Sequence, residues 1–324
     1  MRKHFFTLLK IGVTLAGLAY VLAQVPLAEI SAEFAGIRWS WLIVAFILIM
    51  LGVLVRAYRW LLLLRGLGVA VAFKRLVAIY FVGSFFNTFL PSGFGGDVVR
   101  VFEVAQNVPR NVAAGTVIVD RLLGMLMLFV MALLALPFRP ASFPDSLLGP
   151  IIAICVIGLT GGIVLLEGSF IRRLGRWLPG KLSIVDERQP LARLLQAVQG
   201  SGRQAILQAL AASTVLNLML TGWWMAAGLA LGYPISYLYF LLIVPILSVA
   251  LLAPSIGGLG VNETLAPLLF VGAGLAPVQA VTLSLLVFIL LRLAGLFGAP
   301  IYVVSTIRAG QAQRERSAKA AKSA

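Results

Sequence analysis

Six charged residues lie inside otherwise apolar stretches of this 324-residue sequence: Asp97, Arg100, Asp120, Arg121, Glu263 and Arg292. A charge at the centre of a bilayer costs about 2.5–3.5 kcal/mol on an insertion scale, so such residues pair with one another or line a water-filled cavity. Arginine presents a fork of donors that suits phosphate oxygens. We therefore expect these six residues, together with Asn262, to bind an anionic substrate.

A structural role competes with binding at several of these positions. Asp97 and the pair Asn262–Glu263 each stand where a helix would restart, so they could serve as N-terminal helix caps. The adjacent Asp120 and Arg121 could equally hold two helices together. Capping and binding are compatible, and both interpretations stay open at this stage.

Two glycine-rich breaks flank the charged positions. Their candidate tip residues are Asn87, Pro91, Ser92, Gly95 and Gly96 in the first, and Pro254, Ser255, Gly257 and Gly258 in the second. Residues 76–90, as a helix, would extend only about 22 Å, less than the ~30 Å hydrocarbon core. Each break is therefore predicted to be the tip of a re-entrant hairpin. Its free backbone groups need a polar cavity, and its restarted helix offers an anion the positive end of a dipole.

The composition places both hairpins in a polytopic membrane protein. The sequence is 61% hydrophobic and 11% charged, values far from those of soluble domains. Six full spans are predicted, at residues 5–25, 39–64, 113–136, 147–166, 205–231 and 278–304. Lys10 favours an uncleaved first helix over a signal peptide. Arg56, Arg59 and Arg65 are interpreted as the cytoplasmic flank of the second span.

The distribution of Lys and Arg sets the expected orientation. We expect residues 167–203 to form the main cytoplasmic loop and residues 309–324 a disordered basic tail, so that both termini are cytoplasmic. Residues 1–308 then form a single membrane domain in a bacterial-type inner (plasma) membrane.

The order span, hairpin, span occurs twice, at residues 39–136 and 205–304, in opposite orientations. Trp60 precedes Pro91 by 31 residues, and Trp223 precedes Pro254 by the same number. Inverted repeats with interrupted helices are a common plan of transporters. The predicted fold is thus all-α, with about six full spans and two opposed re-entrant hairpins whose tips meet near the midplane. Chance similarity between two glycine-rich apolar segments is the competing explanation.

Several function classes do not fit the sequence. Cys155 and His4 are the only residues of their types, so we expect no metal site and no cofactor. Gly180–Lys181 lacks the rest of a phosphate-binding loop. The net charge of +15 follows the membrane flanks rather than a nucleic-acid surface. We expect no enzyme activity; the oligomeric state is left open.

The two hairpin segments and the Asp120–Arg121 pair resemble the lysylphosphatidylglycerol synthase transmembrane family. The resemblance spans residues 5–308 and implies movement of a phospholipid or another lipid-linked anionic headgroup between leaflets. We expect no aminoacylation of lipid, because the sequence has no soluble synthase domain. A glycosyltransferase acting on polyprenyl-phosphate sugars through Glu29 and Glu33, and a transporter of a small soluble anion, are the alternatives.

Overall fold

The computed structural model describes residues 2–89, 95–105, 109–167, 202–251 and 259–307, and the single residues 200, 253, 255 and 311. These residues form helices and connecting turns, with no strand among them. Five of the hairpin-tip residues (Pro91, Ser92, Pro254, Gly257 and Gly258), most of the loop 167–203 and nearly all of the tail 309–324 lie outside the described residues. The all-helical part of the predicted fold is confirmed.

The helices are α1 (Arg2–Gln24), α2 (Leu27–Ala35), α3 (Trp39–Gly66), α4 (Phe73–Phe89), α5 (Gly95–Val104), α6 (Arg110–Ala135), α7 (Leu148–Glu167), α10 (Gly202–Ala230), α11 (Tyr237–Ala250), α12 (Val261–Phe270) and α13 (Pro277–Leu296). Short 3-10 turns at Leu136–Phe138 and Asp145–Leu147 connect α6 to α7, and a third at Val271–Ala273 follows α12.

Among the described residues, five helices are long and apolar enough to cross a membrane. They are Trp39–Gly66, Val112–Phe138, Asp145–Leu166, Gly202–Ala230 and Pro277–Ile307. A sixth candidate is the pair Gly12–Ala23 and Leu27–Ala35, which is bent by 79°. The chain is therefore a multi-pass membrane protein, with five or six candidate spans where about six were predicted.

Helix α2 follows a sharp bend after α1 and lies between the first two predicted spans. Pro26 precedes the first residue of α2, and its extended conformation breaks the helical path. Ile30 of α2 then packs with Val21, Val25 and Val281 in a small apolar cluster. This burial explains why the short segment is helical.

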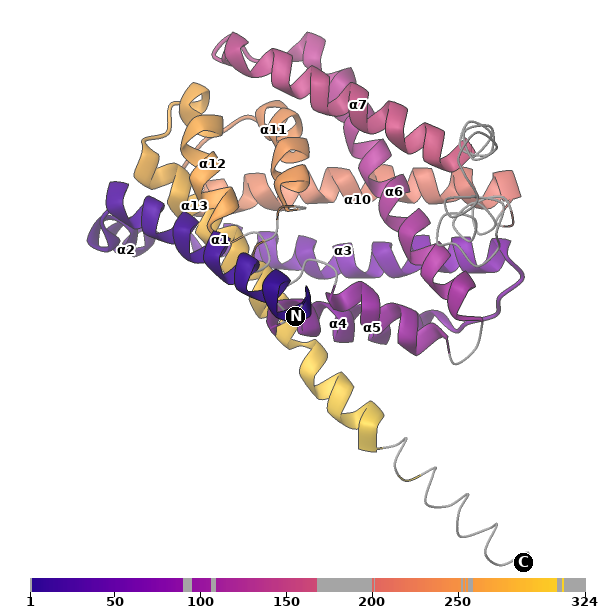
Figure 1. Ribbon diagram of the computed structural model, residues 1–324. Helices are drawn as coiled ribbons and strands as arrows, with labels where there is room; N and C mark the ends of the chain where they lie inside the picture. Colours follow the sequence, from indigo (N-terminus) through magenta and orange to yellow (C-terminus); the bar gives the residue numbers. More distant parts are fainter. Residues whose placement is uncertain are drawn as a thin grey trace, which may run out of the picture.

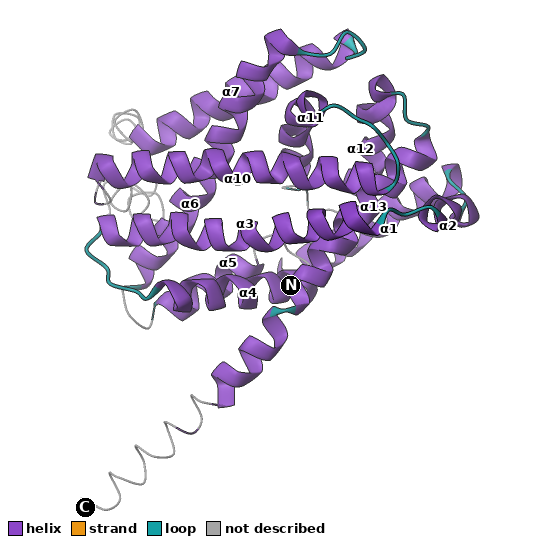
Figure 2. Ribbon diagram, turned by 180° about the vertical axis from the view of Figure 1, so that it is seen from behind, coloured by secondary structure: helices purple, strands orange, loops and turns teal. Residues whose placement is uncertain are grey.

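The centre of the molecule is the pairing of α3 with α10, which run side by side along the bundle (Figures 1 and 2). Gly52 of α3 leaves room for the ring of Trp223 on α10, since a methyl group at Gly52 would lie 3.1 Å from that ring. The two predicted repeat segments meet at this contact. Trp223 and Phe240 belong to the largest apolar core cluster.

Helix α4 lies against α3 on the side away from α10, and α5 packs against α4 and α6 (Figures 1 and 2). They fold back on each other: the Gly96 N–H donates to Asn87 Oδ1 at 2.6 Å. Gly83 and Gly96 bring the two backbones into direct contact, and any side chain at Gly96 would collide with the Gly83 carbonyl. This packing places the start of α5 beside the end of α4.

The candidate span that begins with α13 continues beyond Leu296 to Ile307, and its end stands apart from the other helices (Figure 1). At the other end of the bundle, the Tyr233 hydroxyl donates to Glu33 Oε2 at 2.6 Å, which joins the turn after α10 to α2. Burial, reinforced by the Glu33 carboxylate, raises the pKa of Tyr233 above its usual range. Glu33 is thus a structural acceptor at this position.

Candidate functional site

Asp120 is the centre of a buried charge cluster. Its Oδ1 accepts from Arg59 Nε at 2.6 Å, and its Oδ2 accepts from Arg100 Nη2 at 2.9 Å and from the Tyr80 hydroxyl at 2.7 Å. Asp120 is 1% exposed, and both arginines are 5% exposed or less. One carboxylate therefore neutralises parts of two guanidinium groups away from water.

Arg100 is held by more than its ion pair with Asp120. Its guanidinium carbon lies 4.3 Å from the ring centroid of Trp60 and 4.0 Å from that of Tyr80. The Trp60 indole N–H donates to Thr116 Oγ1 at 3.1 Å, which fixes that ring against α6. A desolvated cation over two aromatic faces gains additional electrostatic attraction, about 2 kcal/mol or more in buried cases.

The cluster opens toward Asp97 and Arg121, which are less buried. Asp97 Oδ1 accepts from Arg100 Nη1 at 3.1 Å, while the other Asp97 oxygen forms an ion pair with Arg121. The side chain of Arg121 is 35% exposed and that of Asp97 is 16% exposed. These two residues form the accessible edge of the cluster.

Arg56 adds a further positive charge beside the cluster. It lies one turn before Arg59 on α3, on the same side of that helix. Its guanidinium carbon is 5.8 Å from the Trp223 ring centroid. None of the ion pairs found among the described residues includes Arg56. The four arginines Arg56, Arg59, Arg100 and Arg121, with Asp97 and Asp120, give the described residues of the cluster a formal charge of +2.

Four helices build this cluster, and helical spacing explains which side chains reach it. Residues three or four apart share a helix face, which groups Arg56 with Arg59 on α3 and Asp97 with Arg100 on α5. Arg59 stands seven residues before the end of α3, about 10 Å from it at 1.5 Å per residue. The cluster therefore lies on the second half of α3, with Arg59 about as far from the middle of the helix as from its end.

The structure brings four of the predicted charged residues together: Asp97, Arg100, Asp120 and Arg121. The other predicted residues have different partners. Arg292 Nη1 donates to the Asn87 carbonyl at 2.8 Å, so it joins α13 to the end of α4. Glu263 accepts from the Gly260 N–H and the Ser284 hydroxyl. Asn262 is partly buried on the same turn of α12 as Glu263.

The tip residues that the structure describes also have defined places. The Asn87 side chain accepts from the Gly96 N–H. Gly95 and Gly96 are buried at the start of α5, and Ser255 is 3% exposed. The remaining tip residues lie outside the described part of the chain, as stated above.

Sequence reasoning missed Arg59, Tyr80 and Arg56 as members of the cluster. It used Arg59 only as a marker of the cytoplasmic flank, whereas in the structure Arg59 is 4% exposed and paired with Asp120. Only Arg65 in that group is exposed. The available signal was the three-residue spacing of Arg56 and Arg59 inside an apolar helix, which puts both on one face.

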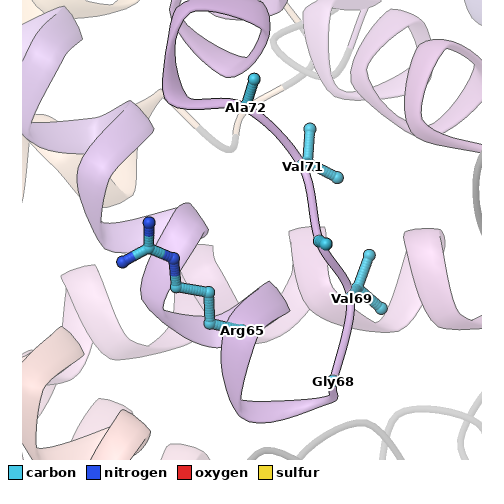
Figure 3. Close-up of a pocket in the computed structure, with 6 residues that line it drawn as sticks. Arg65, Gly68, Val69, Val71 and Ala72 are labelled. Carbon is cyan, nitrogen blue, oxygen red and sulfur yellow. The ribbon is translucent and has the colours of Figure 1, made fainter.

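A shallow hollow of about 480 Å³ lies elsewhere, along the turn that joins α3 to α4 (Figure 3). Its lining is Arg65 and residues 68–72, with the apolar side chains of Val69 and Val71 beside the backbone. Arg65 is the charged side chain of this lining, and one cation beside a short stretch of main chain provides few groups for binding a substrate. The charge cluster is the stronger candidate site.

The fold and the cluster define an integral membrane protein with buried, mostly paired charges between its helices. The chain belongs to the family described as the lysylphosphatidylglycerol synthase TM region, whose model matches residues 7–297. The expected family resemblance is thereby confirmed. This family membership indicates a role related to membrane lipids.

Two archaeal proteins are similar to this chain. A UPF0104 membrane protein of Pyrococcus horikoshii is 25% identical over 313 residues, which cover 88% of this chain and 92% of that protein. A UPF0104 membrane protein of Methanocaldococcus jannaschii is 28% identical over 106 residues, or 32% of each chain. Both names describe membrane proteins and no activity.

Proposed function

We propose that this protein is a lipid translocase that moves a phospholipid or another lipid-linked anionic headgroup between leaflets. The observation that carries the proposal is the concentration of arginines over aspartates inside a membrane bundle, a formal charge of +2 among the described residues of the cluster. Excess positive charge at low dielectric is unfavourable until an anion joins it. A headgroup phosphate supplies that charge while its acyl tails remain in the bilayer.

The edge formed by Asp97 and Arg121 is the proposed point of entry, because it is the more exposed part of the cluster. Arg121 would contact the phosphate first, and Arg56 would approach it from α3. Arg59 and Arg100 are held by Asp120, so they would contribute a fixed positive field. The proposal involves no covalent step on the substrate.

We further propose that α4–α5 and α11–α12 are re-entrant hairpins. The helix lengths support this. The first arms, α4 and α11, have 17 and 14 residues, and the second arms, α5 and α12, have 10 residues each. At 1.5 Å per residue these arms extend roughly 15–26 Å, less than the ~30 Å hydrocarbon core. Contact between Gly83 and Gly96 supports the first hairpin directly.

Corresponding contacts in the two segments support the proposed inverted repeat. Arg100 and Glu263 each lie nine residues after the prolines at 91 and 254. Arg100 bonds to Asp120, 20 residues later, and Glu263 bonds to Ser284, 21 residues later. Each contact joins the second arm of a hairpin to the helix that follows it. Opposed hairpins would give the two leaflets alternating access.

The proposed orientation keeps both termini on the cytoplasmic side of an inner membrane, with the charge cluster toward the cytoplasmic leaflet. A glycosyltransferase using Glu29 and Glu33 gains no support, since Glu33 accepts from Tyr233. A soluble anion could enter the same cluster, and the assay below separates the two substrates.

The proposal is tested by reconstituting the protein in vesicles with fluorescent phosphatidylglycerol and measuring exchange between leaflets. Arg121→Gln removes one cation from the accessible edge of the cluster. A hydrogen bond to a charged group contributes about 1.5–3 kcal/mol, so we expect exchange to slow by about tenfold or more. Arg139→Gln is the matched control, because Arg139 lies in the turn between α6 and α7 and pairs with exposed Asp145.

Two outcomes contradict the proposal. One is equal exchange by Arg121→Gln and the wild type. The other is release of trapped phosphate from vesicles that contain the wild-type protein, without exchange of phosphatidylglycerol. That result would identify a transporter of soluble anions.

A further inference from the structure

Glu263 is a buried carboxylate on the first turn of α12. It is 1% exposed, its Oε2 accepts from the Gly260 N–H at 2.7 Å, and its Oε1 accepts from the Ser284 hydroxyl at 3.0 Å. Gly260 adopts a positive φ of 83° and packs against Gly17 of α1, where a side chain at Gly17 would lie 2.6 Å from the Gly260 carbonyl oxygen. Tight backbone packing thus closes the site on the α1 side.

This carboxylate differs from Asp120 in the charge around it. Asp120 lies between two arginines, whereas none of the ion pairs found in the described part of the chain includes Glu263. Where the first half pairs Arg100 with Asp120, the second half pairs Glu263 with the neutral Ser284. A buried carboxylate with neutral partners is expensive to keep ionised, and protonation removes that cost.

The helices packed around α12 supply few other ionisable groups. Residues 12–23 of α1 contribute Tyr20, which is 54% exposed. Helix α11 contributes Tyr237 and Tyr239, whose hydroxyls donate to the Leu218 and Leu269 carbonyls. Helix α13 contributes Arg292, two turns beyond Ser284 and bonded to Asn87. On α12 itself, Glu263 is the ionisable residue.

The partners of Glu263 suit a proton better than a metal ion. Gly260 offers it an N–H, and the described residues contain no group of three or more His, Cys, Asp or Glu side chains able to hold a metal. Serine can donate to a carboxylate or accept from a carboxylic acid, because its hydroxyl rotates. Ser284 can therefore satisfy Glu263 in both protonation states.

A purely structural helix cap accounts for only one of the two oxygens. The Gly260 contact is the cap, and glutamine can provide it equally well at this position. The second oxygen faces Ser284 in the interior. Glu263→Gln thus keeps the cap and removes the ability to gain or lose a proton.

We propose that Glu263 is a proton-binding site, and that release and uptake of its proton couple translocation to the proton gradient. Ser284 stands seven residues after the start of α13, about 10 Å from it. In the proposed topology this site lies toward the leaflet opposite the Asp120 cluster. The coupling rests on the proposed function, whereas proton binding rests on the Glu263 site alone.

The first arm of the test measures proton binding without transport. Infrared difference spectra of the purified protein in nanodiscs are recorded during a pH titration, and the carbonyl stretch of a protonated carboxylic acid is followed. We expect a band that titrates in the wild type and in Glu29→Gln, and is lost in Glu263→Gln. Glu29 is the matched control because it is an exposed acid of α2.

The second arm measures phosphatidylglycerol exchange in vesicles with and without a pH gradient. We expect the pH gradient to change the exchange rate of the wild type and of Glu29→Gln. The factor of that change should be at least about ten times the factor for Glu263→Gln. A spectrum unchanged by Glu263→Gln overturns proton binding, and equal gradient responses of the wild type and Glu263→Gln overturn coupling. An intact Glu263 band without lipid exchange supports proton binding and contradicts the translocase function instead.

Discussion

At the scale of single residues, the polar interior depends on how each carboxylate is neutralised. Asp120 receives two guanidinium groups and a phenol, so it remains a fixed anion. Glu263 receives a backbone N–H and a hydroxyl, which satisfy its hydrogen bonds without supplying positive charge. The same chemical group thus has a structural role in one half and a proposed proton-carrying role in the other.

Asp120→Asn should destabilise the protein strongly. The variant leaves Arg59 and Arg100 without their shared counter-charge in a buried site, and breaking such a pair costs about 3–5 kcal/mol. The measurement is the unfolding midpoint in detergent micelles. Asp145→Asn makes the same chemical change in an exposed pair with Arg139, where a loss of at most about 1 kcal/mol is expected. Similar midpoints for the two variants would count against a structural role for the cluster.

At the scale of helices, short glycine-rich contacts set the geometry of the site. Gly83 and Gly96 let α4 and α5 approach until their backbones touch, and this approach holds Asp97 and Arg100 toward α6. Asn87 closes the same contact and accepts from Arg292 through its carbonyl. Arg292 therefore links α13 to the end of α4 instead of joining the cluster.

Gly96→Ala should disrupt this packing. Its added methyl group would meet the Gly83 carbonyl and the Asn87 amide, and overpacking of this kind costs about 1–3 kcal/mol. The unfolding midpoint in micelles should fall, and lipid exchange should fall with it. Gly149→Ala on α7 is the control, because nothing lies within 4 Å of the added carbon. Equal behaviour of the two alanine variants would show that the α4–α5 contact is looser than described.

At the scale of the whole molecule, the α3–α10 pair joins two segments that each present an interrupted pair of helices (Figures 1 and 2). The arginine cluster lies on the second half of α3, and Glu263 contacts Ser284 on the first half of α13. In the proposed inverted arrangement these are opposite sides of the membrane. The sequence analysis expected all six charged residues to form one anion site, whereas Glu263 bonds to Ser284 and Arg292 to the Asn87 carbonyl.

Cysteine labelling tests the topology in a Cys155→Ser background, since Cys155 is buried. Ala70→Cys and Pro109→Cys flank α4 and α5, and both should react from the cytoplasmic side. Pro234→Cys and Ala276→Cys flank α11 and α12, and both should react only from the opposite side, as should Ser142→Cys. All five positions are exposed in the structure. Labelling of Ala70→Cys and Pro109→Cys from opposite sides would mean that α4 and α5 cross the membrane.

The sequence by itself determined the class of protein and much of the inventory of polar residues. Composition and periodicity report local properties directly. Such properties are apolar runs long enough to cross a bilayer and the charged residues that interrupt them. Spans near 39–64, 113–136, 147–166, 205–231 and 278–304 therefore agree closely with the helices observed. Asp97, Arg100, Asp120 and Arg121 were identified for the same reason.

Only the tertiary structure decided which charges meet. Arg59 lies 61 residues from Asp120, and Tyr80 lies 40 residues from it, so no local pattern links them. The same holds for Arg292, which reaches the Asn87 carbonyl across 205 residues. Helix packing brings these groups within hydrogen-bonding distance, because each buried charge must find partners in the apolar interior. It also leaves Glu263 with neutral partners, a difference that spacing along the chain cannot show.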